Sequence, residues 1–179
     1  MAIRPVLVIG DPRLPIRLRG TVWLICRSRE LEALIGDLRD TMAASDGAGL
    51  AAPQIAVPLR LVIFGITTNP RYPEAPPIPE TILINPEITP LGDEQQLGSE
   101  GCLSVPGRRA EVQRARRIRY RALTPEGQWI EREVEGFHAR VVQHECDHLD
   151  GVLFPDRLPA TNAEAAAADG LRSPASDPG

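Results

Sequence analysis

A His-Glu-Cys-Asp-His string near the end of the chain restricts the fold more than any other stretch. An α-helix turns about 100° per residue, so His144 and His148 lie about 40° apart on one face and can bind one metal ion. Glu145 lies beside that ion without binding it, which is typical of metal-assisted hydrolysis. Residues 137–150 contain no helix breaker, and Gly151 suits the left-handed position that ends a helix. The sequence therefore predicts a metal-binding helix over residues 137–150.

Two imidazoles are too few for a catalytic metal site, which has about three protein ligands and one open position. The remaining histidine, His138, is six residues before His144 and points away from the metal face. Downstream of the pair the candidate ligands are acidic, and Glu164 lies in an alanine-rich tail that offers no rigid position. The third ligand is therefore expected upstream.

The three cysteines differ in their suitability as that ligand. Cys146 is two residues past His144, about 200° around the helix, and faces away from the metal. Cys26 lies in an apolar run and is expected to be a small buried residue. Cys102 follows Gly101 on a predicted loop or strand edge, where a thiolate is a strong ligand for a divalent transition metal. Cys102 is therefore the candidate third ligand, against the alternative of a buried structural thiol.

Composition indicates a globular protein and excludes several other classes. The chain has 179 residues, 42% of them hydrophobic, and a net charge of −4, which suits one domain and gives no case for nucleic-acid binding. No apolar run approaches the roughly 20 residues of a membrane span. An odd number of cysteines without a secretion signal favours the reducing cytoplasm. We expect a monomeric, cytoplasmic protein with one catalytic domain over residues 1–159 and a flexible tail over 160–179.

The rest of the chain predicts an α+β fold, with mixed or antiparallel sheets packed around the metal helix. Residues 29–43 form an amphipathic N-terminal helix with Ser28 as its N-cap. Strands are expected over residues 21–26, 60–66, 81–85, 110–123 and 128–134. Pro86 is expected to end its strand, residues 67–80 are a proline-rich loop, and residues 92–96 are a turn. The arginines between residues 108 and 121 are assigned to the solvent face of a strand, with a functional basic patch as the alternative.

Residues 47–54, Gly-Ala-Gly-Leu-Ala-Ala-Pro-Gln, let the backbone approach another group closely. A phosphate cradle is excluded, because no Lys-Ser/Thr pair follows and no strand and helix frame the glycines. A plain turn remains an alternative. Gln54 is either a surface amide or a positioned hydrogen-bond donor, and the residue alone does not decide.

Three separated segments together resemble the peptide deformylase family, which removes the N-formyl group from nascent bacterial polypeptides. Residues 47–54 resemble its first motif, Glu100-Gly-Cys-Leu-Ser104 its second, and Gln143-His-Glu-Cys-Asp-His148 its third. The motifs are intact and in order, and the similarity runs from about residue 42 to 158. Residues 15–27 depart from the family pattern.

The resemblance implies a hydrolase whose single divalent metal ion is held by Cys102, His144 and His148. In this family the metal is generally ferrous iron, often replaced by zinc, nickel or cobalt. The fourth position then holds water, and Glu145 is the implied general base. The products are formate and a peptide with a free N-terminal methionine.

The resemblance also implies which groups bind the substrate. The metal, the Leu103 backbone N–H and the Gln54 side-chain amide are the implied donors to the oxyanion. The substrate is an N-formylmethionyl peptide or nascent chain, which pairs with the backbone near Gly49 and Gly101 by strand addition. Transient contact with ribosomes is a further expectation. Candidate residues of the methionine pocket, on the metal helix, are Phe137 and Val141.

Two alternatives remain beside the resemblance. One is a zincin-like endopeptidase with Glu164 as its third metal ligand. The other is a structural metal module or interaction domain without catalysis. Removal of the Cys102 thiol distinguishes the first alternative, and removal of the Glu145 carboxylate distinguishes the second.

Overall fold

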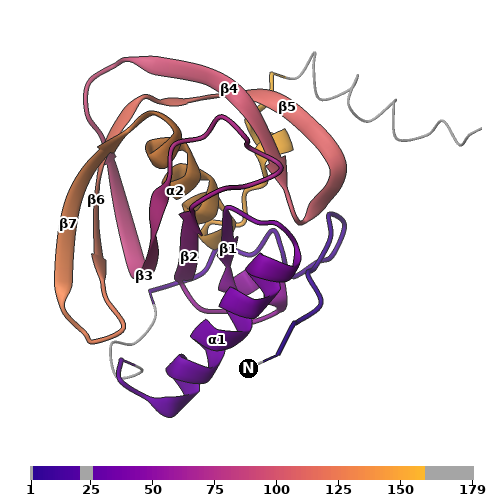
Figure 1. Cartoon of the computed structure of the whole chain (residues 1–179), viewed down its shortest axis with the longest axis vertical. Helices are drawn as coiled ribbons and strands as arrows, with labels where there is room; N and C mark the ends of the chain where they lie inside the picture. The colour runs from indigo at the N-terminus through magenta and orange to yellow at the C-terminus, as the bar shows by residue number, and fades with distance from the viewer. Residues whose placement is uncertain (1, 21–25, 160–179) are drawn as a thin grey trace, which may run out of the picture.

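Two antiparallel sheets enclose one long helix in the computed structural model, which describes residues 2–20 and 26–159 (Figure 1). The larger sheet has the order β1-β2-β3-β6-β7, and β4 pairs with β5 in the smaller one. The strands are β1 (Gly49–Ala51), β2 (Leu61–Ile66), β3 (Ile78–Pro90), β4 (Gln95–Cys102), β5 (Val105–Ala115), β6 (Arg117–Leu123) and β7 (Trp129–Glu135). The helices are α1 (Arg29–Ala44) and α2 (Gly136–Leu149), with short 3₁₀ turns η2 (Ala52–Ile55) and η3 (Phe154–Arg157). The predicted α+β fold around a central helix is confirmed.

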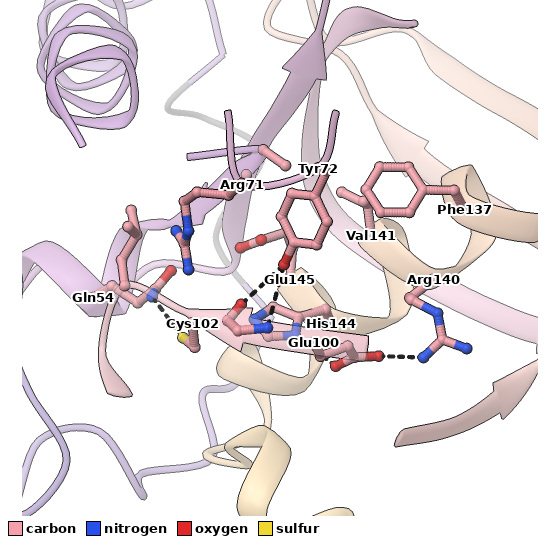
Figure 2. Close-up of a pocket in the computed structure, with 14 residues that line it drawn as sticks. Gln54, Arg71, Tyr72, Glu100, Cys102, Phe137, Arg140, Val141, His144 and Glu145 are labelled. Carbon is pink, nitrogen blue, oxygen red and sulfur yellow. Dashed lines mark hydrogen bonds and ion pairs between the residues drawn. The ribbon is translucent and has the colours of Figure 1, made fainter. Parts of the chain in front are cut away.

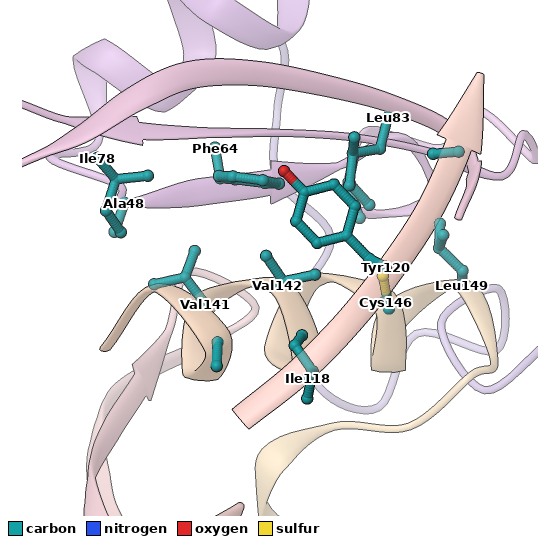
Figure 3. Packing of buried hydrophobic residues seen from close by; sticks show 14 of the residues in the cluster. Ala48, Phe64, Ile78, Leu83, Ile118, Tyr120, Val141, Val142, Cys146 and Leu149 are labelled. Carbon is teal, nitrogen blue, oxygen red and sulfur yellow. The ribbon is translucent and has the colours of Figure 1, made fainter. Parts of the chain in front are cut away.

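The two faces of the larger sheet carry separate hydrophobic cores, as β2 shows. Phe64 points towards α2 and packs in one cluster with Val142 and Leu149 of that helix (Figure 3). Leu61 and Ile63 belong to a second cluster, which includes the buried residues of α1. Because successive side chains of a strand point to opposite faces, β2 supplies both cores. The sheet is therefore held between α1 and α2.

Both predicted helices are confirmed, with small changes at their ends. The Ser28 hydroxyl accepts a hydrogen bond from the Leu31 N–H at 3.1 Å, as expected of an N-cap. Gly151 follows α2 with a φ of +75°, and a Cβ there would lie 2.5 Å from the Pro15 carbonyl carbon. Glycine at this position therefore ends the metal helix and also lets the N-terminal arm pack against it.

The single strand predicted for residues 110–123 is wrong. β5 pairs with β4 as far as Ala115, and β6 pairs with β3 from Ile118 onwards, so the two halves belong to different sheets. Val112 and Tyr120 are both fully buried, because the alternation keeps its phase across the break. Alternation predicts which face of a strand is buried, but it does not identify the partner strand.

Arg114 corrects a second expectation about the same stretch. The arginines of this run are predicted on a solvent face, yet the Arg114 side chain is only 5% exposed. Its guanidinium donates hydrogen bonds to the carboxylates of Glu100 and Asp147. A buried charge is tolerated where it is paired in this way, and a charge pattern alone does not show such partners.

Other boundaries differ in detail. β3 continues through Pro86, with an irregular register between Ile84 and Glu87 that accommodates the proline. β4 begins at Gln95, inside the predicted turn. The strand predicted at 21–26 falls on residues outside those described, except Cys26, which is half-buried in a turn. The predicted tail over 160–179 also lies outside them. None of the helices in the described ranges has the length and apolarity to cross a bilayer.

Candidate active site

The structure brings Cys102, His144 and His148 together. Their ligand atoms all lie within 4.8 Å of one another, and the three residues are buried. Cys102 ends β4, whereas the histidines are one turn apart on α2 with ring centroids separated by 5.1 Å. The Cys102 Sγ lies 3.4 Å from Nε2 of His148. Segments far apart in the chain thus place one sulfur and two imidazoles around a common point.

The surroundings of Cys102 favour its thiolate form. Burial alone would raise the pKa of this thiol, but the neighbouring His148 and His144 lower that pKa well below its usual value. The Ser104 N–H also donates to Sγ, at 3.4 Å. One thiolate and two imidazoles form a donor set that suits several divalent transition metals and leaves a position open.

The other candidate ligands face away, as predicted. Burial raises the pKa of the Cys146 thiol well above its usual value, and this residue packs in the core between α2 and the larger sheet (Figure 3). The His138 ring packs edge-on against Phe64, with centroids 5.6 Å apart. Within the described residues, neither belongs to a cluster of metal-ligating side chains.

Glu145 is buried beside the three donors. Its Oε2 has no hydrogen-bond partner among the described residues, so the carboxylate remains available for a ligand or a water molecule. Burial raises the pKa of Glu145 to about 7. A carboxylate with a pKa near the working pH is well matched to accepting and returning a proton.

Gly49 makes room for that carboxylate. A Cβ on Gly49 would lie 2.6 Å from Cδ and 2.7 Å from Cγ of Glu145, far inside van der Waals contact. Only glycine therefore lets β1 pass so close to the metal helix. The backbone of residues 47–54 was predicted to approach another group closely, and that group is the Glu145 side chain.

Gln54 is a positioned donor, and the alternative of a surface amide is wrong. The side chain is 1% exposed. Its Oε1 accepts from the Ala51 N–H at 2.8 Å, which fixes the orientation of the amide. Its Nε2 donates to Ser104 Oγ at 3.0 Å and to Cys102 Sγ at 3.6 Å (Figure 2). The Gln54 amide nitrogen is thus aimed at the thiol of the candidate ligand Cys102.

Sequence reasoning assigned no role to Glu100, which orients one of the imidazoles. Its Oε2 lies 2.8 Å from Nδ1 of His144, and its carboxylate also accepts from Arg114 and Arg140. Burial opposes ionisation, but the hydrogen bonds from Arg114 and His144 hold the pKa of Glu100 well below its usual value. Because Nδ1 is occupied by the carboxylate, Nε2 of His144 is the nitrogen left for a metal. The sequence signal that could have identified Glu100 is its position two residues before Cys102.

Replacing Arg114 with methionine is expected to lower the free energy of unfolding by about 3–5 kcal/mol, because it leaves Glu100 and Asp147 buried without their shared cation. Urea denaturation measures this loss. The matched control is Arg116→Met, whose solvent-exposed pair with Glu94 is expected to contribute far less to stability than the buried network. Equal losses in the two variants would contradict the importance assigned to the buried network.

A small cleft adjoins the carboxylate and the donors. Its volume is about 30 Å³, enough for a water molecule or two but not for a methionine side chain. Tyr72, from the proline-rich loop, lines it: the Tyr72 hydroxyl accepts from the Gly101 N–H at 3.2 Å and donates to the Gly101 carbonyl at 3.3 Å (Figure 2). The cleft wall also includes the predicted pocket residues Phe137 and Val141, and the predicted oxyanion residue Leu103.

Comparison with known proteins identifies the family. The sequence model described as polypeptide deformylase matches residues 3–164. The chain is 57% identical over 159 residues to peptide deformylase 1 of Prochlorococcus marinus, covering 88% of this chain and 82% of that protein. It is 59% identical over 156 residues to peptide deformylase 1 of Bordetella pertussis, covering 87% of this chain and 88% of that protein.

Solved structures agree with the sequence comparison. A class I type b peptide deformylase from Acinetobacter baumannii with bound Met-Ala-Ser superposes with a TM-score of 0.85 and 39% identity, covering 88% of this chain and 99% of that one. The peptide deformylase from Thermus thermophilus superposes with a TM-score of 0.80 and 36% identity, covering 94% of this chain and 93% of that one. The chain therefore belongs to the polypeptide deformylase family and is a hydrolase that removes the N-formyl group from nascent polypeptides.

Proposed function

We propose that Cys102, His144 and His148 hold one divalent metal ion, at which this chain hydrolyses the formyl amide of N-formylmethionyl peptides. The convergence of the three ligand atoms within 4.8 Å carries this proposal. The unpartnered Glu145 Oε2 beside them supports it, since a buried carboxylate oxygen needs a partner. A divalent cation there would supply Lewis acidity, which brings the pKa of water towards 7 and polarises the formyl carbonyl.

Glu145 is the proton carrier in this proposal. It accepts the proton of the attacking water as the oxygen adds to the formyl carbon, and it then donates that proton to the departing amine. Formate and a peptide with a free amino group leave. The buried position of Glu145, and the pKa of about 7 that burial causes, support a group that works in both directions near neutral pH.

Gln54 and Leu103 are the proposed donors to the negative oxygen of the tetrahedral intermediate. Gln54 is already oriented by Ala51, so its Nε2 needs no reorganisation when charge develops. Leu103 directly follows Cys102 and lines the same cleft, so its backbone N–H is close to the reacting group.

The peptide is proposed to bind as an added strand between Gly49 and Gly101, with its methionine against Phe137 and Val141. The Met-Ala-Ser complex of the Acinetobacter enzyme supports a methionyl peptide as ligand. The N–H and carbonyl groups of Gly101 that a substrate strand would use are bonded to Tyr72 in this structure. Binding therefore requires the Tyr72 hydroxyl to leave Gly101.

Other properties are proposed from the family and the donor set. Ferrous iron is the proposed native metal, with zinc, nickel or cobalt able to replace it. Residues 1–159 are proposed to form one catalytic domain and 160–179 a flexible tail, in line with a family match that ends at residue 164. The protein is proposed to act as a monomer in the cytoplasm, where transient contact with ribosomes would deliver nascent chains.

Formate release from N-formyl-Met-Ala-Ser, by protein prepared and assayed without oxygen, tests the proposed function. We expect multiple turnovers that a chelator abolishes and added Fe²⁺, Ni²⁺ or Co²⁺ restores. Oxygen is excluded because it can oxidise the thiolate ligand. Metal-loaded protein that releases no formate under these conditions would contradict the proposal.

Gly49→Ala tests the position of Glu145 independently of its chemistry. The new methyl group would displace the carboxylate, and a shift of about 1 Å near the reacting atoms typically costs about 100-fold in rate. We expect a fall of that size in kcat. In a Glu145→Ala background the same substitution should cause little further loss, because the colliding carboxylate is absent. Full additivity of the two effects would contradict this explanation.

A further inference from the structure

A second groove, of about 450 Å³, continues from the active site along β5. It shares Arg71, Cys102 and Leu103 with the catalytic cleft, so a peptide bound in that cleft would extend into it. Its remaining lining residues include no acid: they are Ser45, Val105, Pro106, Gly107, Arg108 and Arg109. Three guanidinium groups therefore border the path of the substrate.

These three arginines differ from the four arginines between residues 114 and 119, which are all paired with carboxylates. Arg114, Arg116 and Arg119 each form an ion pair with a carboxylate. For the three groove arginines, no carboxylate among the described residues lies within the 4.0 Å of an ion pair. Arg109 instead donates to Ser99 Oγ at 3.3 Å, and its guanidinium lies over the Tyr72 ring. None of the three guanidinium groups thus forms a direct ion pair with a carboxylate in the described part of the molecule.

Two of the guanidinium groups lie against the glycine at which the substrate strand is proposed to pair. A Cβ on Gly101 would lie 3.0 Å from Arg71 Nη2 and 3.3 Å from Arg109 Nη1. Arg109 stands directly opposite Gly101 in the β4–β5 register, so the missing side chain leaves space for the arginine. Figure 2 shows the Arg71 guanidinium pointing into the cleft between Gln54 and Tyr72. An incoming peptide would pass these cations.

We propose that Arg71, Arg108 and Arg109 make this enzyme prefer substrates with acidic side chains in the two residues after the formyl-methionine. This inference rests on the proposed function. An extended chain advances about 3.3 Å per residue, so these side chains lie roughly 3–7 Å beyond the methionine, within reach of the groove. The whole chain has a net charge of −4, which would repel an acidic peptide. The preference therefore has to come from the local cluster.

The test compares two peptides of equal shape, N-formyl-Met-Ala-Glu-amide and N-formyl-Met-Ala-Gln-amide. We expect kcat/KM to be about 5- to 20-fold higher for the glutamate peptide at low salt, mainly through a lower KM. At about 1 M salt, where the Debye length is about 3 Å, the ratio should fall below about 2. The amide caps remove the terminal carboxylate, which the same arginines would otherwise attract.

Variants test whether the groove arginines cause the preference for the glutamate peptide. The double variant Arg108→Gln/Arg109→Gln and the triple variant that adds Arg71→Gln are expected to remove the difference between the two peptides. The control is Arg29→Gln, which removes one positive charge at the exposed start of α1. This helix is about 24 Å long, and Ser45, which lines the groove, lies at its other end. It should keep the full preference.

The outcomes separate the two proposals. Equal kcat/KM values for both peptides, in an enzyme that releases formate, would overturn the inference and leave the proposed function intact. Absence of formate from both peptides would overturn the proposed function. A preference that persists in the triple variant, or that Arg29→Gln also removes, would show that the groove is not its source.

Discussion

Replacing Glu145 with glutamine is expected to lower kcat by about 100- to 10,000-fold while the protein keeps its metal. The amide has almost the same shape as the carboxylate, so the cleft and its ligands are preserved. It cannot accept the proton of the attacking water or return it to the leaving amine. Formate release measures kcat, and elemental analysis of the same sample measures bound metal per chain.

The exposed Glu131 on β7 provides the control, since Glu131→Gln removes the same charge far from the cleft and should leave kcat unchanged. Loss of metal together with activity in Glu145→Gln would show that this residue acts as a ligand and not as a base. A structural metal module would have no formate release to lose. The substitution therefore separates a catalytic site from a structural one.

Replacing Cys102 with alanine is expected to abolish metal loading and, with it, deformylation. Two imidazoles remain, and the loss of the thiolate removes both the third ligand and the negative charge that offsets a divalent cation. Metal content after anaerobic loading and dialysis should fall to less than about a tenth of the unmodified protein. Formate release should fall in parallel.

Cys146→Ala is the matched control, because that thiol is also buried but lies on α2 and packs in the core. It should keep the metal and the activity, with a modest loss of stability. Retention of metal and hydrolysis in Cys102→Ala would favour the alternative endopeptidase that uses Glu164 as its third ligand. The pair of variants thus assigns the sulfur ligand without relying on the family.

Local regularities of the sequence were enough to predict the metal helix. The spacing of His144 and His148 and the absence of breakers depend only on the geometry of one helix, and Gly151 has the backbone conformation that its position requires. The same periodicity excluded Cys146 and His138. Cys102 then followed by elimination, although its distance from the histidines could not be calculated from the chain.

Strand partners were not predictable in the same way. Alternation continues unchanged from Val112 to Tyr120, yet the chain leaves one sheet and enters another between Ala115 and Arg117. Burial of alternate residues is compatible with either partner strand. The buried Arg114 was missed for a related reason, because its two carboxylate partners come from β4 and α2.

The sequence by itself determined the class of the fold, the helix that carries two imidazoles, the candidate third ligand and the family. Each of these depends on short-range spacing or on motifs that can be read along the chain. Only the tertiary structure decided that Glu100 orients His144, that Tyr72 bonds to Gly101, and that Arg71, Arg108 and Arg109, which pair with no carboxylate among the described residues, line one groove beside the cleft. These contacts join residues from separate strands, loops and helices, and their meeting depends on the pairing and register of the sheets.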